Sequence, residues 1–200
     1  MGRTQDVPSA VVDAYDASLT RTTLTELSTA RFCHAAASTP SYLLVAGGKS
    51  GTKKTSRYYS NVDTYNANLT KSTATSLEVP VCRLAAGSIS GYAIFAGGVE
   101  KDDDGYNDVY LYNNSLTRSV GTPLSSVKCD HTAVSTPKYV LFAGGTDWYS
   151  ASYNNVVNAY DASLTQSIVE PLSVARANAS GVYIEGFALI AGGNASASNI

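Results

Sequence analysis

Four apolar runs of the same design recur along the chain and predict four buried β-strands. The runs read YLLVAGG, YAIFAGG, YVLFAGG and FALIAGG and begin at Tyr42, Tyr92, Tyr139 and Phe187. Their unbroken apolar character is typical of a strand buried on both faces, since a half-exposed strand would alternate apolar and polar residues. The Gly-Gly pair that closes each run indicates a turn or a close approach of the backbone to a neighbour.

Three further segments accompany each apolar run and complete a unit of four short strands. A segment rich in small residues precedes the run, as in FCHAAAS from Phe32. A segment such as NVDTYNA from Asn61 follows it and ends in an Asx-rich turn. The fourth segment, as in TKSTATSL from Thr70, is polar and Thr-rich, which favours an exposed outer strand.

The units repeat at a nearly fixed period. The third segments VDAYDASLT, VDTYNANLT, VYLYNNSLT and VNAYDASLT carry tyrosines 47 to 50 residues apart, at Tyr15, Tyr65, Tyr112 and Tyr160. The Gly-Gly pairs have the same spacing, so the length varies only in the loop between each pair and the next tyrosine. Because the pair recurs in every unit, the stretch GGKS from Gly47 is architectural and is not a phosphate loop.

Four short strands per unit at this period predict an all-β fold, a β-propeller of four-stranded antiparallel blades in a single domain of residues 1–200. Three blades are expected at about 29–77, 78–125 and 126–173, and a composite fourth blade from residues 7–28 with 175–193. This closure would remove open sheet edges. Two alternatives stay open: two chains that share an eight-bladed ring, and a chain that is part of a longer array.

The repeats resemble the kelch family. The matching features are the Gly-Gly pair after the second strand, the tyrosine in the third, and a basic residue before the first, at Arg31, Lys128 and Arg176. The resemblance extends over nearly the whole chain and implies a kelch-like propeller. One feature differs, because the tryptophan that the family carries six residues after the tyrosine is replaced by Arg21, Lys71, Arg118 and Gln166. The packing between blades that the indole supplies is then expected from Leu19, Leu69, Leu116 and Leu164.

Charge and composition narrow the classes of partner. The net charge is −2 and charged residues make up 15% of the chain, so no broad positive field recruits nucleic acid or an anionic membrane. No apolar run has the length of a membrane span, and the first residues lack the apolar segment of a secretory signal. These features predict a cytoplasmic protein that does not insert into a membrane and does not bind nucleic acid.

The loop that varies in length carries most of the candidate binding residues. Its copies contain Tyr58, Tyr59, Tyr106, Trp148, Tyr149 and Tyr153. All these loops are expected on one face of the ring, where aromatic side chains on a rigid scaffold commonly bind sugars or peptides. For Tyr59, Tyr106 and Tyr153 a role in blade packing is the alternative. Trp148 and Tyr149 have no counterpart in the other repeats and are the better candidates for ligand binding.

Metal sites and disulfides are not expected. His34 and His131 share a repeat position and could face each other across a channel, but two ligands make a poor metal site. Asp102, Asp104 and Asp108 surround a turn without the full spacing of a calcium loop, so a solvated acidic turn is expected. The three cysteines lack metal-type spacing and are expected to be reduced, buried thiols.

These observations favour a non-catalytic binding or scaffold module without a cofactor. Its face of variable loops is expected to bind a protein or a glycan. The near-identity of the copies, as in YDASLT at Tyr15 and Tyr160, is typical of recent duplication and suits a bacterial or phage surface module. The first alternative is a carbohydrate-active enzyme, because the kelch-like propellers that the repeats resemble include a sugar oxidase and a sialic acid mutarotase. The second is a purely structural role, as a monomer or as a homodimer that forms a larger ring.

Overall fold

The computed structural model describes residues 7–51, 55–101, 105–147, 149–150 and 152–196. Within these residues the chain forms antiparallel β-sheets and no helix, so the expected all-β class is confirmed. In the same part of the chain, no helix is long and apolar enough to cross a membrane.

Three complete four-stranded sheets form the body of the molecule, and each has the expected strand order. Sheet A contains β3 (Ala35–Ser38), β4 (Tyr42–Ala46), β7 (Val62–Asn66) and β8 (Lys71–Ala74). Sheet B contains β9 (Ala85–Ile89), β10 (Tyr92–Val99), β11 (Gly105–Tyr112) and β12 (Arg118–Val120). Sheet C contains β13 (Thr132–Ser135), β14 (Tyr139–Ala143), β17 (Val157–Asp161) and β18 (Gln166–Val169).

Five two-stranded pairs complete the fold of the described residues. The N-terminal hairpin contains β1 (Asp13–Tyr15) and β2 (Arg21–Thr23), and the C-terminal hairpin contains β20 (Ser180–Ile184) and β21 (Phe187–Ala191). Three smaller pairs are β5 (Lys49–Ser50) with β6 (Arg57–Tyr58), β15 (Thr146–Asp147) with β16 (Ser152–Tyr153), and β19 (Arg176–Ala177) with β22 (Asn194–Ala195).

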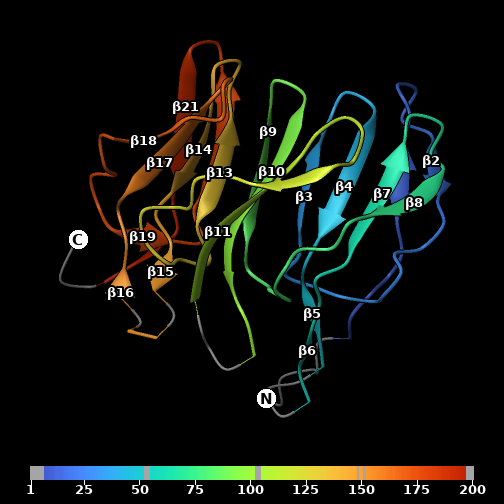
Figure 1. Cartoon of the computed structure of the whole chain (residues 1–200), viewed down its shortest axis with the longest axis horizontal. Coiled ribbons are helices and arrows are strands. Elements are labelled where there is room, and N and C mark those ends of the chain that lie inside the picture. The colour runs from blue at the N-terminus through green and yellow to red at the C-terminus, as the bar shows by residue number, and fades with distance from the viewer. Residues whose placement is uncertain (1–6, 52–54, 102–104, 148, 151, 197–200) are drawn as a thin grey trace.

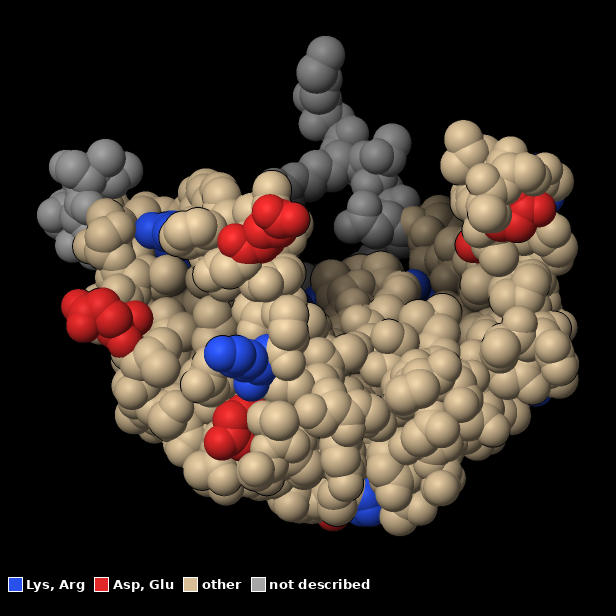
Figure 2. Space-filling view, turned by 90° about the horizontal axis from the view of Figure 1, so that it is seen from above, with Lys and Arg blue, Asp and Glu red and all other residues tan. Residues whose placement is uncertain are grey.

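The sheets stand side by side in an arc (Figure 1). Their first strands are neighbours, since β3 contacts β9, β9 contacts β13 and β13 contacts β20. The two terminal hairpins lie at opposite ends of this arc, and the molecule is hollowed between its ends (Figure 2). The expected fourth blade is therefore not formed in the structure: β1–β2 and β20–β21 are separate sheets, held apart by the three sheets between them.

The repeated apolar runs form the core, as predicted for β4, β10 and β14. One apolar cluster lies between sheets A and B and includes Leu44, Phe95 and Tyr112, and a second lies between sheets B and C and includes Phe142 and Tyr160. The polar fourth strands are mostly exposed. The apolar run in β21 differs, because its residues are exposed or half-buried in the absence of a third strand beside it.

The recurring tyrosines and glycines join each unit to its neighbour. The hydroxyls of Tyr65, Tyr112 and Tyr160 donate to a carbonyl of the preceding unit at 2.7, 2.7 and 2.8 Å. In the other direction, Gly48, Gly98 and Gly145, the second glycines of the first three pairs, each donate the backbone N–H to a carbonyl of the following unit, as Gly48 does to Val81 at 2.8 Å. Both glycines of every pair have positive φ, which explains why the pair recurs.

The expected leucine packing is only half correct. Leu116 and Leu164 pack against the two core clusters, whereas Leu19 and Leu69 are exposed. Leu69 faces a preceding unit of only two strands, and Leu19 lies in that two-stranded unit itself, so both leucines lack the surface that the other two contact. Six residues after Tyr112, Arg118 lies over the Tyr110 ring at 5.6 Å and pairs with Glu78, in the connection between sheets A and B, at 2.9 Å.

Candidate binding face

The variable loops emerge at one end of the sheets, at the bottom of Figure 1. There the pair β5–β6, the extended β10–β11 hairpin and the pair β15–β16 continue beyond the Gly-Gly turns. Each extension is tied to the segment before the first strand of its unit by an antiparallel bridge, Phe32 with Lys49, Cys82 with Val99 and Cys129 with Thr146. The loops therefore stand on a hydrogen-bonded base.

Two tyrosines of the first loop are held in place by this base. Tyr58 is half-buried against a small cluster of Cys82, Val99 and Cys129. The ammonium of Lys49 lies 5.6 Å from the Tyr58 ring and 5.8 Å from the Phe32 ring, so the cation contacts both aromatic side chains. The hydroxyl of Tyr59 shares a 2.8 Å hydrogen bond with the Ser50 hydroxyl. Each ring can present one side to a ligand without a large loss of side-chain freedom.

The remaining aromatic residues differ in exposure. Tyr106 in β11 is half-buried and packs against the core between sheets A and B, and Tyr153 in β16 is half-buried. Tyr149 is 90% exposed, and its backbone N–H donates to the Asp147 carboxylate at 3.1 Å. Trp148 lies outside the described residues. Tyr149 is thus an exposed aromatic side chain whose backbone N–H is bonded to Asp147.

The two histidines line one pocket of about 330 Å³ at the inner side of the arc, together with Cys33, Arg83 and Asp130. His34 is exposed and His131 is buried. Arg83 pairs with Asp130 at 2.6 Å, a contact between neighbouring units that the sequence did not indicate. Among the described residues, no cluster of three or more His, Cys, Asp or Glu could hold a metal ion. Asp102 and Asp104 lie outside those residues, and Asp108 is half-buried in β11.

Desolvation and nearby cations favour the neutral form of both histidines. Burial lowers the pKa of His131 to about 3, with a further contribution from the charge of Lys128. Partial desolvation in the pocket lowers the pKa of His34, together with the charge of Arg31. Lys128 is itself fully buried, and within the described part of the chain its ammonium donates only to the Val156 carbonyl, at 3.3 Å. Burial lowers its pKa to about 8.

Lys128→Met is expected to stabilise the protein at neutral pH by about 1 to 3 kcal/mol, because it removes a buried charge that no carboxylate of the described residues pairs with. The unfolded chain retains the Lys128 proton up to the ordinary pKa of 10.5, while the folded chain releases it near 8. The stability of the wild type should therefore rise relative to that of the variant between these pH values. Urea denaturation from pH 7 to 10 measures the difference, and a gap that does not narrow with rising pH would contradict it.

The cysteines are free thiols, and two of them are buried as expected. Burial raises the pKa of Cys82 to about 12 and that of Cys129 to about 11, which makes both thiols unreactive. Cys33 differs from the expectation, because it is exposed at the inner pocket. Its backbone has φ 56°, a conformation that Arg83, Asp130 and Asn178 share at the same repeat position.

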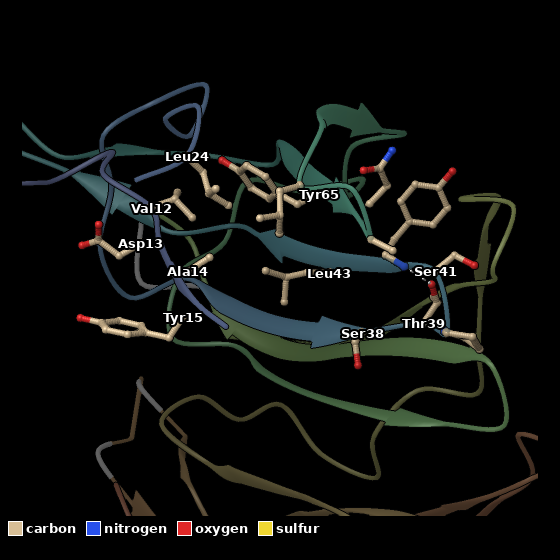
Figure 3. A pocket seen from close by; sticks show the side chains of 15 residues that line it. Val12, Asp13, Ala14, Tyr15, Leu24, Ser38, Thr39, Ser41, Leu43 and Tyr65 are labelled. Atoms are coloured by element: carbon tan, nitrogen blue, oxygen red, sulfur yellow. Dashed lines mark hydrogen bonds between the residues drawn. The ribbon is translucent and has the colours of Figure 1, made fainter. Parts of the chain in front are cut away.

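A further pocket of about 430 Å³ lies between the N-terminal hairpin and sheet A, away from the variable loops. In Figure 3, Val12, Asp13 and Ala14 of the hairpin line one side, and Leu43 lies across from them on β4. Leu24 and Tyr65 line it at the top of the view, and the turn from Ser38 to Ser41 lies at its right end. This pocket occupies the place beside β1 where a complete sheet has its first two strands.

Neither a protein-family model nor a curated protein matches this sequence. Among solved structures, that of YjhT is similar to this chain with a TM-score of 0.74 and 13% sequence identity. The match covers 96% of this chain and 75% of that chain. At this identity the likeness concerns the fold alone.

Proposed function

We propose that this protein is a non-catalytic binding or scaffold module of the kelch-like propeller type, which recognises a protein or a carbohydrate through the variable loops at one end of its sheets. The observation that carries the proposal is the exposed ring of Tyr149, which stands on a hydrogen-bonded turn at the same end as the restrained side chains of Tyr58 and Tyr59. Exposed aromatic side chains on rigid supports bind sugar faces and peptide side chains at low entropic cost.

The proposed function includes a closed ring of β-sheets. Three sheets with the same strand order, joined by the same hydrogen bonds between units, support a closed propeller in the working protein. Closure would place all variable loops around one opening, so that several could contact one ligand.

Tyr149→Ala is expected to weaken ligand binding at least about tenfold, since truncation of an aromatic anchor removes most of its contact. A glycan array and a peptide array identify the ligand, and titration calorimetry then measures the dissociation constant. Tyr139→Ala is the matched control, because Tyr139 is an exposed tyrosine of the same unit at the opposite end of sheet C. Equal affinities of both variants and the wild type would exclude the loop face as the binding site.

A further inference from the structure

We propose that the two terminal hairpins are the halves of an interface between copies of this chain. The N-terminal hairpin of one copy pairs with the C-terminal hairpin of a second copy, and together they form a four-stranded sheet. This inference rests on the ring that the proposed function includes, and it identifies what completes the ring.

Each hairpin has an open edge where a complete sheet has a partner strand. In sheet A, β4 pairs with β3 on one edge and with β7 on the other. Within the described residues, β21 pairs only with β20, and β1 only with β2. By repeat position β21 corresponds to β4 and β1 corresponds to β7, so each hairpin presents the strand that the other lacks.

The repeat positions also define the register of this pairing. In sheet A, Val45 of β4 lies opposite Asp63 of β7. Ile190 and Asp13 hold the same positions in FALIAGG and VDAYD. The shared sheet is therefore expected to place Ile190 opposite Asp13, and Leu189 opposite Ala14.

A buried ion pair accompanies this register in sheet A. The Arg31 guanidinium donates to the Val45 carbonyl at 3.1 Å and pairs with the Asp63 carboxylate at 2.9 Å. Lys71 of the neighbouring strand reaches the same carboxylate at 3.1 Å. One arginine before the first strand and one aspartate in the third thus join the two halves of the sheet.

The terminal hairpins hold these charges separately. Arg176 donates to the Ile190 carbonyl at 3.0 Å, as Arg31 does to Val45, but no carboxylate of the described residues pairs with it. Its buried Nε has no hydrogen-bond partner among those residues. Asp13, at the other end of the arc, has Arg21 at 3.9 Å in the place of Lys71. Pairing the hairpins brings Asp13 to Arg176 and completes the same charge arrangement.

The exposure of Tyr15 indicates that the N-terminal hairpin lacks a preceding unit to contact. Its three counterparts, Tyr65, Tyr112 and Tyr160, are buried, and each donates its hydroxyl to the preceding unit. Tyr15 itself is 66% exposed. In the shared sheet the preceding unit is sheet C of the second copy, where the position that accepts from the other tyrosines is that of Glu170.

Apolar surface accumulates at both ends of the arc. The C-terminal hairpin exposes Val182, Ile184, Phe187 and Leu189. At the other end, the pocket beside β1 exposes Leu43 and is lined by Val12, Ala14 and Leu24. Burial of these side chains against each other supplies the apolar contribution that a stable interface needs.

A second copy fits these edges better than the hairpin of the same chain. The three complete sheets hold the two hairpins of one chain at opposite ends, and hydrogen bonds between units, such as Gly98 N–H to the Lys128 carbonyl at 3.0 Å, define each step of the arc. Closure within one chain would change the angle at every step. Two copies joined at both ends would hold six complete sheets and two shared ones.

Multi-angle light scattering over a range of concentrations tests the proposal. The wild type is expected to have twice the mass of one chain. Asp13→Arg and Arg176→Glu should each weaken association at least about tenfold, because each places like charges together at both contacts. An equimolar mixture of the two variants should recover the doubled mass, since one contact then joins the two substituted side chains, of opposite charge, and the other joins the native Asp13 and Arg176. Recovery on mixing requires contacts between chains.

A cross-link gives an independent measurement that does not depend on the charges. In a Cys33→Ser background, Ala14→Cys and Leu189→Cys are introduced in separate chains and mixed under oxidising conditions. A disulfide-linked dimer is expected from the mixture and not from either variant alone. Circular dichroism checks that each variant keeps its β-sheet signal.

A wild type that has the mass of one chain at every concentration would overturn the proposal, as would an association that neither charge variant weakens. A monomer that forms the disulfide when Ala14→Cys and Leu189→Cys are combined in one chain would indicate closure within that chain. Loop binding is measured separately with Tyr149→Ala, whose association state should not change, so failure of the interface and failure of the binding face are distinguishable.

Discussion

Asp63→Ala is expected to lower the free energy of unfolding by about 3 to 5 kcal/mol, because it leaves a buried arginine without its counter-charge. Arg31 and Asp63 are both inaccessible to solvent, and their side chains join the segment before β3 to β7 at 2.9 Å. The carboxylate also accepts hydrogen bonds from the Ser28 backbone and hydroxyl. Urea denaturation at pH 7, followed by circular dichroism, measures the loss.

The effect of Asp63→Ala should shrink in acid. Burial raises the pKa of Asp63, but the interactions with Lys71, Ser28 and Arg31 together outweigh it, so the folded-state pKa lies below the ordinary value of 3.8. The carboxylate therefore contributes its full stabilisation above that value and loses it as the pH falls through the folded-state pKa. An equal destabilisation at pH 7 and at pH 2 would contradict the assignment.

Sheet B supplies the control for this variant. At the two repeat positions of the ion pair, sheet B has Val81 and Tyr110, two buried side chains without charge. The double variant Arg31→Val with Asp63→Tyr should therefore recover a large part of the lost stability. If the double variant were as unstable as Asp63→Ala, the residues around this site in sheet A would not accept an apolar replacement of the ion pair.

Gly47→Ala is expected to lower the free energy of unfolding by about 2 to 4 kcal/mol, for two reasons whose effects add. Gly47 has φ +71°, which disfavours any residue with a Cβ. A Cβ at this position would lie 2.6 Å from the Val81 carbonyl oxygen of the next unit, so the contact between sheets A and B would have to open. The melting temperature and the urea midpoint should both fall.

Gly91→Ala separates the two reasons. Gly91 has φ +83° in the turn between β9 and β10, and a Cβ there would meet nothing within 4 Å. Its cost should be limited to backbone strain, about 1 kcal/mol. If the two variants were equally destabilised, the close approach between units would contribute nothing and the role of Gly47 would be that of a simple turn.

Local patterns were sufficient for the strands and for the Gly-Gly turns. The apolar run YAIFAGG predicts a strand buried on both faces, and β10 is buried over nearly its whole length. The aromatic loops were also recognisable, because their variation in length and their tyrosines can be read from the local sequence. The exposure of Tyr149 and the restraint on Tyr58 by Lys49 required the structure, since both depend on what lies across the hairpin.

Several features could not be read from the repeats because they depend on contacts between units. The pairing of Arg83 with Asp130 joins the same position of two neighbouring units, and the repeat pattern gives no sign of it. The exposure of Leu69, against the half-burial of Leu116, follows from the missing strands beside sheet A. A repeat pattern treats the four copies as equivalent, whereas the ends of an open array are not.

The sequence by itself determined the all-β class, the four-strand order and the positions at which units meet, because these depend on side-chain periodicity and on backbone freedom that each repeat carries within itself. Only the tertiary structure decided how far the units turn from one to the next. That angle depends on many contacts between neighbouring units, such as the hydrogen bond from the Tyr112 hydroxyl of sheet B to the Thr75 carbonyl of the preceding unit at 2.7 Å. This angle leaves Asp13 and Arg176, two residues of opposite charge, at opposite ends of an open arc.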